Sequence, residues 1–456
     1  MVEVDAVVNE GLGNSSYLLD LGDGRAAVID PERDPRPYLA RAGARGLRVA
    51  FAVETHVHAD FVTGSRELAA AGAQVVAARG AKLGFPHRGL DDGQRLDLGG
   101  LTLEAVATPG HTPGHVAWLV RDGDAPAGVF TGGALVVGGV ARTDLAGPDR
   151  AEELSRAVYR SVTERLLTLP GELPVWPTHG PGSFCSTGPA GERISTIGKE
   201  KAGNPLLAGD PDEELFVARL MGGLSAYPAY FDRLPRYNRC GPRVYAGAWP
   251  ALPELDVANV YRMLDDDEAL LIDVRPVRQF AAGHIPAAVS IELRPQFATW
   301  LGWLADPGRP LVFVLDPDQD PAELVSQCLN VGYENLAGAL AGGIPAWQAA
   351  AGPLAKIPLI GAGQLGLGLI LDIRQQAEWD AGHIPHAIHI ELGALPARAS
   401  SVPAVPLTVM CAHGQRSMTA ASLIARARGT TSGLGVFTGS AQQWSAATGC
   451  VLRQGP

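Results

Sequence analysis

The sequence lacks the features that would assign it to a membrane, secreted or nucleic-acid-binding class. No uninterrupted apolar run reaches the roughly 18 residues that a membrane-spanning helix needs. The first residues, from Met1 to Asp5, are acidic and apolar without a basic residue, so we expect no secretory signal peptide. The net charge of −11 disfavours nucleic acid, whose binding requires a basic surface. We therefore predict a soluble cytoplasmic protein with no membrane or nucleic-acid partner.

The sequence also has few cysteines and no C-x-x-C motif. There are five cysteines, an odd number, and they are scattered along the chain. This usage indicates a reducing compartment and at least one reactive thiol, and it argues against a disulfide framework. The positions are Cys185, Cys240, Cys328, Cys411 and Cys450.

Part of the sequence occurs twice, one domain length apart. His284 and His383 lie in matching Gly-His-Ile-Pro segments, 99 residues apart (383 − 284). A period of this length indicates tandem domains and not a solenoid. Gly- and Pro-rich stretches interrupt the apolar pattern near Pro250 and between Gly352 and Gly363. We therefore predict an α/β multidomain chain of 456 residues, with domains at 1–250, 251–355 and 356–456.

The second copy contains a cysteine loop suited to forming a thiolate. A strand predicted at Leu407–Met410 leads into the run Cys-Ala-His-Gly-Gln-Arg-Ser, and a helix is predicted over Met418–Arg428. Such a turn points backbone N–H groups inward, while an arginine and a helix N-terminus add positive potential. Together they lower a thiol pKa from roughly 8.5 toward neutrality. We predict that Cys411 is a nucleophilic thiolate and that the catalytic loop also includes Gly414, Arg416 and Ser417.

The first copy has lost this chemistry. Its strand, predicted at Leu311–Val314, leads to Leu315 where the second copy has Cys411, and to Asp320 where the second copy has Arg416. The nucleophile is absent and the local charge is reversed, so an anionic sulfur donor would be repelled. We predict a docking or scaffolding role for this copy. A separate cluster of catalytic acids is the less favoured alternative.

The N-terminal part contains histidines at the ends of predicted strands. The strand at Leu47–Val53 is followed by the run Thr-His-Val-His-Ala-Asp, and the strand at Leu101–Ala107 by Thr-Pro-Gly-His. Another Gly-flanked histidine follows a later apolar run. Imidazole and carboxylate ligands that converge from loops suit Zn(II) or Fe(II). The candidate ligands are His56, His58, Asp60, His111 and His179.

The cysteine loop and its preceding motifs resemble the rhodanese family of sulfurtransferases. The pattern is Asp372-x-Arg374, then Gly-His-Ile-Pro at 382–385, then Cys-x-x-Gly-x-Arg-Ser from Cys411. The resemblance implies an α/β rhodanese domain in which the loop cysteine carries a persulfide. It implies a first, inactive rhodanese copy before it.

The order and spacing of the histidine motifs over roughly residues 1–250 resemble the metallo-β-lactamase superfamily. This implies an αββα sandwich with a metal site at one edge. Within the superfamily, the segments at 130–132 and 141–145, at 195–207 and at 227–242 look most like the persulfide dioxygenases. That family holds one Fe(II) with two histidines and one aspartate, which implies His56 and His111 as ligands here, with Zn(II) as the alternative metal. The order of domains looks like bacterial fusions that oxidise persulfides and make thiosulfate.

Two positions depart from the family pattern. The ligand aspartate of the family is replaced by Gly133, and a histidine of the second metal site is replaced by Phe61. Both changes remove ligands of a two-metal hydrolase, so hydrolysis of a thioester is the least favoured chemistry. A mononuclear site loses only the aspartate, and His58, Asp60 or His179 would have to compensate.

We therefore predict a protein of sulfur metabolism, and sulfur transfer through Cys411 is the activity whose motif is complete. The donor would be a small persulfide or thiosulfate, and the acceptor sulfite, cyanide or a thiol. Persulfide oxidation depends on whether the altered metal site holds iron. The alternative is a non-enzymatic scaffold or a sulfide-responsive binding protein. The sequence leaves open whether the chain forms a homo-oligomer.

Overall fold

The computed structural model describes residues 2–188, 191–365 and 368–455. Two compact units divide the chain. Unit 1 consists of Met1–Pro250 with Cys328–Gly332, and unit 2 consists of Ala251–Gln327 with Tyr333–Pro456. No helix in the described ranges is long and apolar enough to cross a membrane.

Unit 1 contains two six-stranded sheets, whose strands are ordered β1-β2-β3-β4-β5-β6 and β12-β11-β10-β9-β8-β7. In the first sheet β1 to β3 pair antiparallel and β3 to β6 pair parallel. The first sheet consists of β1 (Val4–Asn9), β2 (Asn14–Asp20), β3 (Arg25–Ile29), β4 (Arg48–Val53), β5 (Gln74–Ala78) and β6 (Arg88–Leu90). The second consists of β7 (Arg95–Asp97), β8 (Thr102–Ala107), β9 (Val116–Asp122), β10 (Ala125–Gly132), β11 (Pro174–Pro177) and β12 (Ser195–Thr196).

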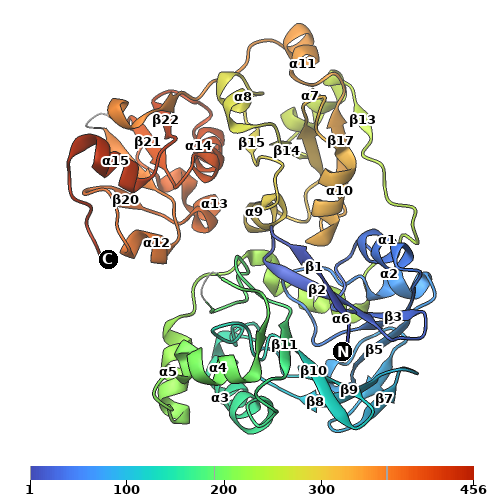
Figure 1. The fold of residues 1–456 in the computed structure, drawn as a ribbon. Helices are drawn as coiled ribbons and strands as arrows, with labels where there is room; N and C mark the ends of the chain where they lie inside the picture. Colours follow the sequence, from blue (N-terminus) through green and yellow to red (C-terminus); the bar gives the residue numbers. More distant parts are fainter. Residues whose placement is uncertain (1, 189–190, 366–367, 456) are drawn as a thin grey trace. The chain divides into compact units, whose positions relative to one another are not determined.

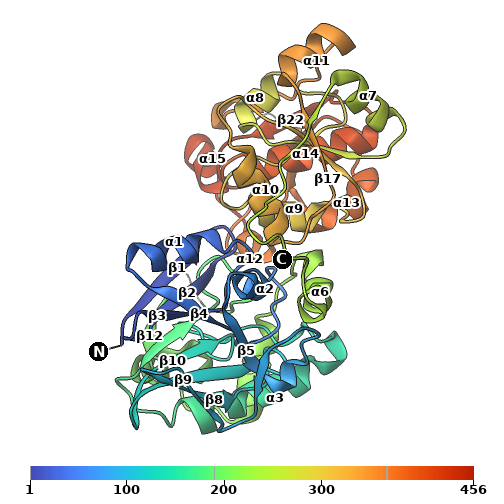
Figure 2. The same cartoon turned by 90° about the vertical axis from the view of Figure 1, so that its right-hand side faces the viewer.

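Side chains alternate between the two faces of these strands, and each face is covered by a different layer. In β3, Ala27 and Ile29 join the core between the sheets, whereas Ala26 and Val28 join a core beneath the helices. The layers are visible in Figures 1 and 2, with helices outside each sheet. This arrangement confirms the predicted αββα sandwich. The helices of unit 1 are α1 (Arg36–Ala44), α2 (Ser65–Ala70), α3 (Ala151–Arg160), α4 (Ile197–Gly203), α5 (Glu213–Gly222) and α6 (Leu234–Cys240).

Unit 2 contains two parallel five-stranded sheets with the same strand order. These are β13-β17-β16-β14-β15 and β18-β22-β21-β19-β20, so the second copy repeats the topology of the first. The first copy has β13 (Glu254–Leu255), β14 (Leu270–Asp273), β15 (Val289–Ser290), β16 (Leu311–Val314) and β17 (Leu336–Leu340), with α7 (Val257–Asp265), α8 (Val277–Ala282), α9 (Phe297–Leu304), α10 (Pro321–Asn330) and α11 (Gly343–Ala351). The second has β18 (Leu359–Ile360), β19 (Leu369–Asp372), β20 (Ile388–His389), β21 (Leu407–Met410) and β22 (Leu434–Phe437), with α12 (Gln376–Asp380), α13 (Leu395–Arg398), α14 (Gln415–Arg428) and α15 (Ala441–Thr448).

The Asp-x-Arg and Gly-His motifs form the same buried clamp in both copies. Arg374 pairs with Asp372 at 2.7 Å and donates to the Gly382 carbonyl at 2.9 Å. Arg275 forms the matching contacts in the first copy, with Asp273 at 2.6 Å and the Gly283 carbonyl at 2.9 Å. The clamp fixes the end of a strand to the end of the following helix. It survives where the cysteine does not, so these motifs stabilise the fold of both copies.

Candidate metal centre and cysteine site

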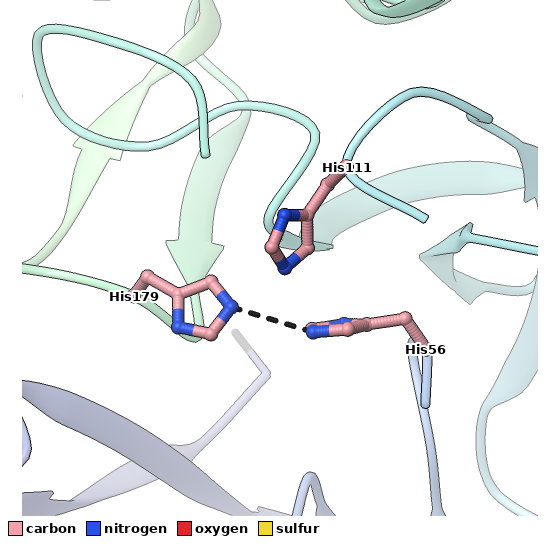
Figure 3. A group of neighbouring side chains, drawn as sticks. All are labelled: His56, His111 and His179. Atoms are coloured by element: carbon pink, nitrogen blue, oxygen red, sulfur yellow. Dashed lines mark hydrogen bonds between the residues drawn. The ribbon is translucent and has the colours of Figure 1, made fainter. Parts of the chain in front are cut away.

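Three buried histidines from three separate loops converge in unit 1. His56 follows β4, His111 follows β8 and His179 follows β11. Their ligand atoms lie within 4.8 Å of one another. Figure 3 shows the three rings turned toward a common point, with His179 Nε2 3.3 Å from His56 Nε2. Within the second sheet, β9 is antiparallel to both β8 and β10, and β10 is parallel to β11, so His111 and His179 leave the sheet at the same edge.

The outer nitrogen of each ring is held by a hydrogen-bond acceptor. His56 Nδ1 donates to Thr55 Oγ1 at 2.8 Å, because the Thr55 hydroxyl already donates to Asp30. His111 Nδ1 donates to the Arg142 carbonyl at 2.7 Å. Each ring therefore presents an unprotonated Nε2 to the centre, as metal-ligating histidines do.

His179 is held in the same manner by two polar side chains. Its Nδ1 donates to Asn14 Oδ1 at 3.1 Å and lies 3.2 Å from Asp60 Oδ2. Asn14 in turn donates to the same Asp60 oxygen at 2.9 Å. The two Nε2 atoms lie at hydrogen-bond distance, 3.3 Å; with both Nδ1 atoms protonated, their lone pairs would repel, and a cation bound between them would relieve that repulsion. Ligand distances of about 2.1 Å from a shared ion place neighbouring nitrogens about 3 to 3.4 Å apart.

His111 supplies an independent sign of a ligand site. Its Nε2 is buried and has no hydrogen-bond partner among the residues that the structure describes. A buried nitrogen without a partner costs free energy unless something binds it. Burial also lowers the pKa values of His56 and His111 well below the ordinary value, so both rings are neutral. Neutral imidazole is the form that binds a metal. The three residues thus fit a divalent metal ion.

The ring of His111 fills the space beside Gly133. A Cβ at Gly133 would lie 2.5 Å from His111 Cδ2 and 2.9 Å from Ala141 Cβ. The Gly133 N–H donates to His115 Nε2 at 2.9 Å, so the backbone here is also fixed. The position that holds an aspartate in the persulfide dioxygenases therefore has no room for one in this arrangement. His179 offers a third ligand atom in its place.

The structure places the other predicted ligands in neighbouring positions. His58 lies 3.0 Å from Glu54 and 3.2 Å from Asp30, and it stacks on Phe61. Although burial lowers the pKa of His58, these two carboxylates raise it to about 10, so the ring is a cation. With Asp30 and His56, His58 forms a second group of nearby ligand atoms.

Two further residues of this site, Cys185 and His115, were not among the predicted metal ligands. Cys185 is buried, and its sulfur lies within ligand range of Asp60 and His179. His115 stacks on His56, and both of its ring nitrogens are hydrogen-bonded, to Thr108 and to Gly133. The second Gly-His of the repeated Pro-Gly-His run was the only signal for His115.

A cavity of about 450 Å³ opens beside His111. Its lining includes three cationic side chains, on Lys82, Arg150 and Arg239. Such a cavity suits a small anionic compound that reaches the histidine centre from solvent. Lys199 and Lys201 of α4 are exposed and do not line this cavity.

In unit 2, Cys411 lies between β21 and α14, as the sequence predicted. The thiol is buried, and the Gly414 N–H donates to Cys411 Sγ at 3.1 Å. Ser417 Oγ shares a hydrogen bond of 3.3 Å with the same sulfur. Gly414 has φ of +94°, a left-handed conformation that favours glycine. The turn therefore uses glycine to direct a backbone donor at the sulfur.

Arg416 faces a carboxylate and not the sulfur. Its guanidinium forms two hydrogen bonds with Glu378 of α12, at 2.6 and 2.8 Å. This bidentate pair fixes the loop to α12 and neutralises much of the charge of Arg416. In the first copy, the Gln319 side chain closes the corresponding loop by bonding the Asp316 N–H and the Val274 carbonyl.

Comparisons with known proteins agree with this architecture. The model of the metallo-beta-lactamase superfamily matches residues 9–196, and the model of the rhodanese-like domain matches residues 256–350 and 359–447. The human persulfide dioxygenase ETHE1 is 36% identical over 234 residues, which are 50% of this chain and 84% of the relative. The bovine protein is 35% identical over the same length. A crystal structure of a metallo-beta-lactamase from Staphylococcus aureus has a TM-score of 0.64 and 25% identity, and the match covers 74% of this chain and 98% of that one.

The chain is therefore a metallo-β-lactamase-fold protein that carries two rhodanese-like domains. Within that superfamily it belongs to the family of ETHE1 persulfide dioxygenases. This combination of domains places the protein in sulfur metabolism.

Proposed function

We propose that the chain joins two reactions, sulfur transfer at Cys411 and oxidation of a persulfide in unit 1. The observation that carries the first reaction is the 3.1 Å contact from the Gly414 N–H to Cys411 Sγ. A backbone donor aimed at a sulfur stabilises the thiolate and, after transfer, the charge of a persulfide.

In the transfer step, the Cys411 thiolate attacks the outer sulfur of thiosulfate or of a small persulfide. A new S–S bond forms at Cys411 Sγ while the donor S–S bond breaks, and sulfite or a thiolate leaves with the electron pair. The N–H groups of the turn at 412–417 hold the negative charge of the resulting Cys411 persulfide. Sulfite, cyanide or a thiolate then attacks the terminal sulfur and regenerates the Cys411 thiolate.

For the second reaction, His56, His111 and His179 would hold one divalent ion. The family favours Fe(II), and Zn(II) is the alternative that three imidazoles also fit. Activation of O₂ toward a sulfur compound is the chemistry that Fe(II) supplies when bound. Thr55, Arg142 and Asp60 orient the three rings, and their contacts keep each Nε2 free.

The cavity beside His111 supports a small anionic persulfide as the substrate. Lys82, Arg150 and Arg239 would hold its carboxylates, while the deeply buried histidines exclude bulk water from the reacting sulfur. The net conversion is persulfide, O₂ and water to thiol and sulfite. Sulfite is also an acceptor at Cys411, where it would leave as thiosulfate, so the two reactions form one sequence.

The experiment that tests sulfur transfer uses thiosulfate as donor and cyanide as acceptor. We expect thiocyanate from the full chain and none from a Cys411→Ser variant. Cys450→Ser is the matched control, because Cys450 is exposed in the same unit. Undiminished transfer by Cys411→Ser would contradict the mechanism. No transfer by the unaltered chain would favour the alternative, a non-enzymatic scaffold or sulfide-responsive binding protein.

A further inference from the structure

The first rhodanese-like copy, matched at 256–350, lacks the cysteine and is here named the silent copy. It packs directly against α14, the helix that begins at the cysteine loop. The Ser290 N–H donates to Ser422 Oγ of α14 at 3.0 Å. Arg426 of α14 donates to the Ala287 carbonyl and pairs with Asp267, both at 3.1 Å. The two copies also share one apolar core. The silent copy is therefore held against the middle and the C-terminal part of α14.

A second contact between the copies joins Trp303 of the silent copy to Gly393 of the second copy. The Trp303 ring occupies the space beside Gly393, where a Cβ would lie within 2.2 Å of the ring. Gly393 is the counterpart of Arg294 at the 99-residue offset. The two copies thus differ at this position, with the cation Arg294 in the silent copy and, in the second copy, a glycine against which Trp303 packs.

A cavity of about 730 Å³ lies between the two copies at the cysteine loop. The second copy contributes His413 and Gln415, the neighbours of Gly414 in the turn, together with Leu359, Gly361 and Thr438. The silent copy contributes Arg278 and Glu292, together with Pro276 and Val277. The catalytically silent copy therefore forms one wall of the space through which a donor reaches Cys411.

One arginine of the silent copy, Arg278, belongs to this wall, and a second, Arg294, follows the wall residue Glu292 in the chain. Arg278 lines the cavity, is exposed, and has no ion-pair partner among the described residues. Arg294 is half-buried, donates to Gln296 at 2.5 Å, and lies two residues beyond Glu292 of the cavity lining. Glu292 is the one carboxylate in the cavity lining, and the positive charge of Arg294 partly offsets its negative charge.

These two arginines supply the charge that Arg416 does not offer. The bidentate pair with Glu378 occupies the guanidinium of Arg416. Thiosulfate, sulfite and carboxylate-bearing persulfides are all anions, and guanidinium groups bind their oxygens through paired N–H donors. A site with one neutralised arginine would draw such donors weakly.

We propose that the silent rhodanese copy provides the anion-binding half of the Cys411 site, with Arg278 and Arg294 binding the oxygens of the sulfur donor. The proposal rests on the function proposed for Cys411. It gives the silent copy a chemical role, the selection of anionic donors, beyond that of a scaffold. Both arginines are specificity residues, since neither takes part in the exchange of S–S bonds.

The first test measures alkylation of Cys411 in the full chain by peptide mass spectrometry. Iodoacetate is an anion and iodoacetamide is neutral, so the ratio of their rates reports the positive potential at the thiol without any sulfur transfer. We expect this ratio to fall about threefold in Arg278→Gln, as for an exposed charge. A fall of about tenfold is expected in Arg294→Gln, whose charge is partly buried.

Arg398→Gln is the matched control, because Arg398 is exposed on α13 and absent from the cavity lining. Its ratio should equal that of the unaltered chain. Unchanged ratios in both Arg278→Gln and Arg294→Gln would overturn the proposal. Because alkylation needs only the thiol, a lowered ratio in a chain that transfers no sulfur would refute the proposed activity and leave the anion site standing.

The second test compares two donors, thiosulfate and glutathione persulfide, with cyanide as the acceptor. A rise in KM for thiosulfate alone assigns the arginines to the sulfur oxyanion. A rise for both donors assigns them to anionic donors in general. KM values that stay unchanged for both donors would overturn the proposal even if the alkylation ratio fell.

Discussion

Asp60 Oδ2 lies 3.2 Å from His179 Nδ1, on the side of the ring opposite the Nε2 atom that faces His56. The carboxylate that follows the His-x-His motif therefore orients a histidine from a loop more than a hundred residues away. It also accepts from Asn14 at 2.9 Å, so its position is fixed from two directions. Carboxylate–histidine pairs of this kind raise the basicity of a ligand nitrogen and set its direction.

Replacing Asp60 with Asn should weaken metal binding without abolishing it. The Asn side chain keeps the size but loses the negative charge that orients His179, and such changes typically cost about tenfold or more in metal affinity. The measurement is a competition titration of the purified chain with a metal chelator. Asp124→Asn is the control, because Asp124 is fully exposed in unit 1. Equal affinities in the two variants would show that Asp60 does not act on His179.

Restoring the family aspartate at Gly133 should not restore a family-type site. A Cβ there would lie 2.5 Å from His111 Cδ2, so Gly133→Asp must displace a ligand ring. We expect less bound metal and a loss of about 1 to 3 kcal/mol in unfolding free energy, as for other overpacked sites. Gly191→Asp is the control, since nothing lies within 4 Å of its Cβ position. Higher metal content in Gly133→Asp would contradict the three-histidine arrangement.

Gly414→Ala should slow sulfur transfer more than it destabilises the chain. Alanine resists the left-handed φ of +94° and would move the N–H away from Cys411 Sγ. Loss of one such donor typically costs on the order of a hundredfold in kcat. Gly429→Ala carries similar backbone strain, with φ of +68°, at the far end of α14. Equal transfer rates in the two variants would show that the N–H contact has no catalytic effect.

The Arg416–Glu378 pair should make the cysteine domain sensitive to acid. Burial raises the pKa of Glu378, but Arg416 lowers it by more, so the pKa lies below its ordinary value. A depressed carboxyl pKa stabilises the fold above the unfolded-state pKa of roughly 4.3, and that stabilisation is lost as pH falls through the folded-state value. Because the carboxylate is partly exposed, we expect no more than about 1 kcal/mol.

The measurement is urea unfolding of the chain and of Glu378→Gln at pH 7 and near pH 4. The difference in stability should be present at pH 7 and smaller at the lower pH. A difference that grows on acidification would show that the pair does not stabilise the charged carboxylate.

The strands that carry the site were predictable because their apolar runs are continuous and end at polar motifs. The segments that lead to His56 and Cys411 are the clearest cases, since β4 and β21 lie where the sequence placed them. The tandem repeat was visible because its clamp residues, such as Asp372 and Arg374, stay the same in both copies.

The partners of the site residues could not be predicted, because they come from distant segments. Glu378 meets Arg416 from 38 residues away, and no local pattern joins the two. His179 reaches His56 from 123 residues away, and its ring could have faced either side of the loop. Arg294 lies in the other rhodanese-like copy, more than a hundred residues before Cys411, so no local pattern joins the two.

The most direct measurement is the iron content of the purified chain beside that of His179→Ala, together with O₂ uptake on addition of glutathione persulfide. We expect near one iron per chain, O₂ uptake and release of sulfite, with all three lost or strongly reduced in His179→Ala. Iron content and O₂ uptake that stay unchanged in His179→Ala would contradict the three-histidine centre. A chain that binds no metal and consumes no O₂ would contradict persulfide oxidation.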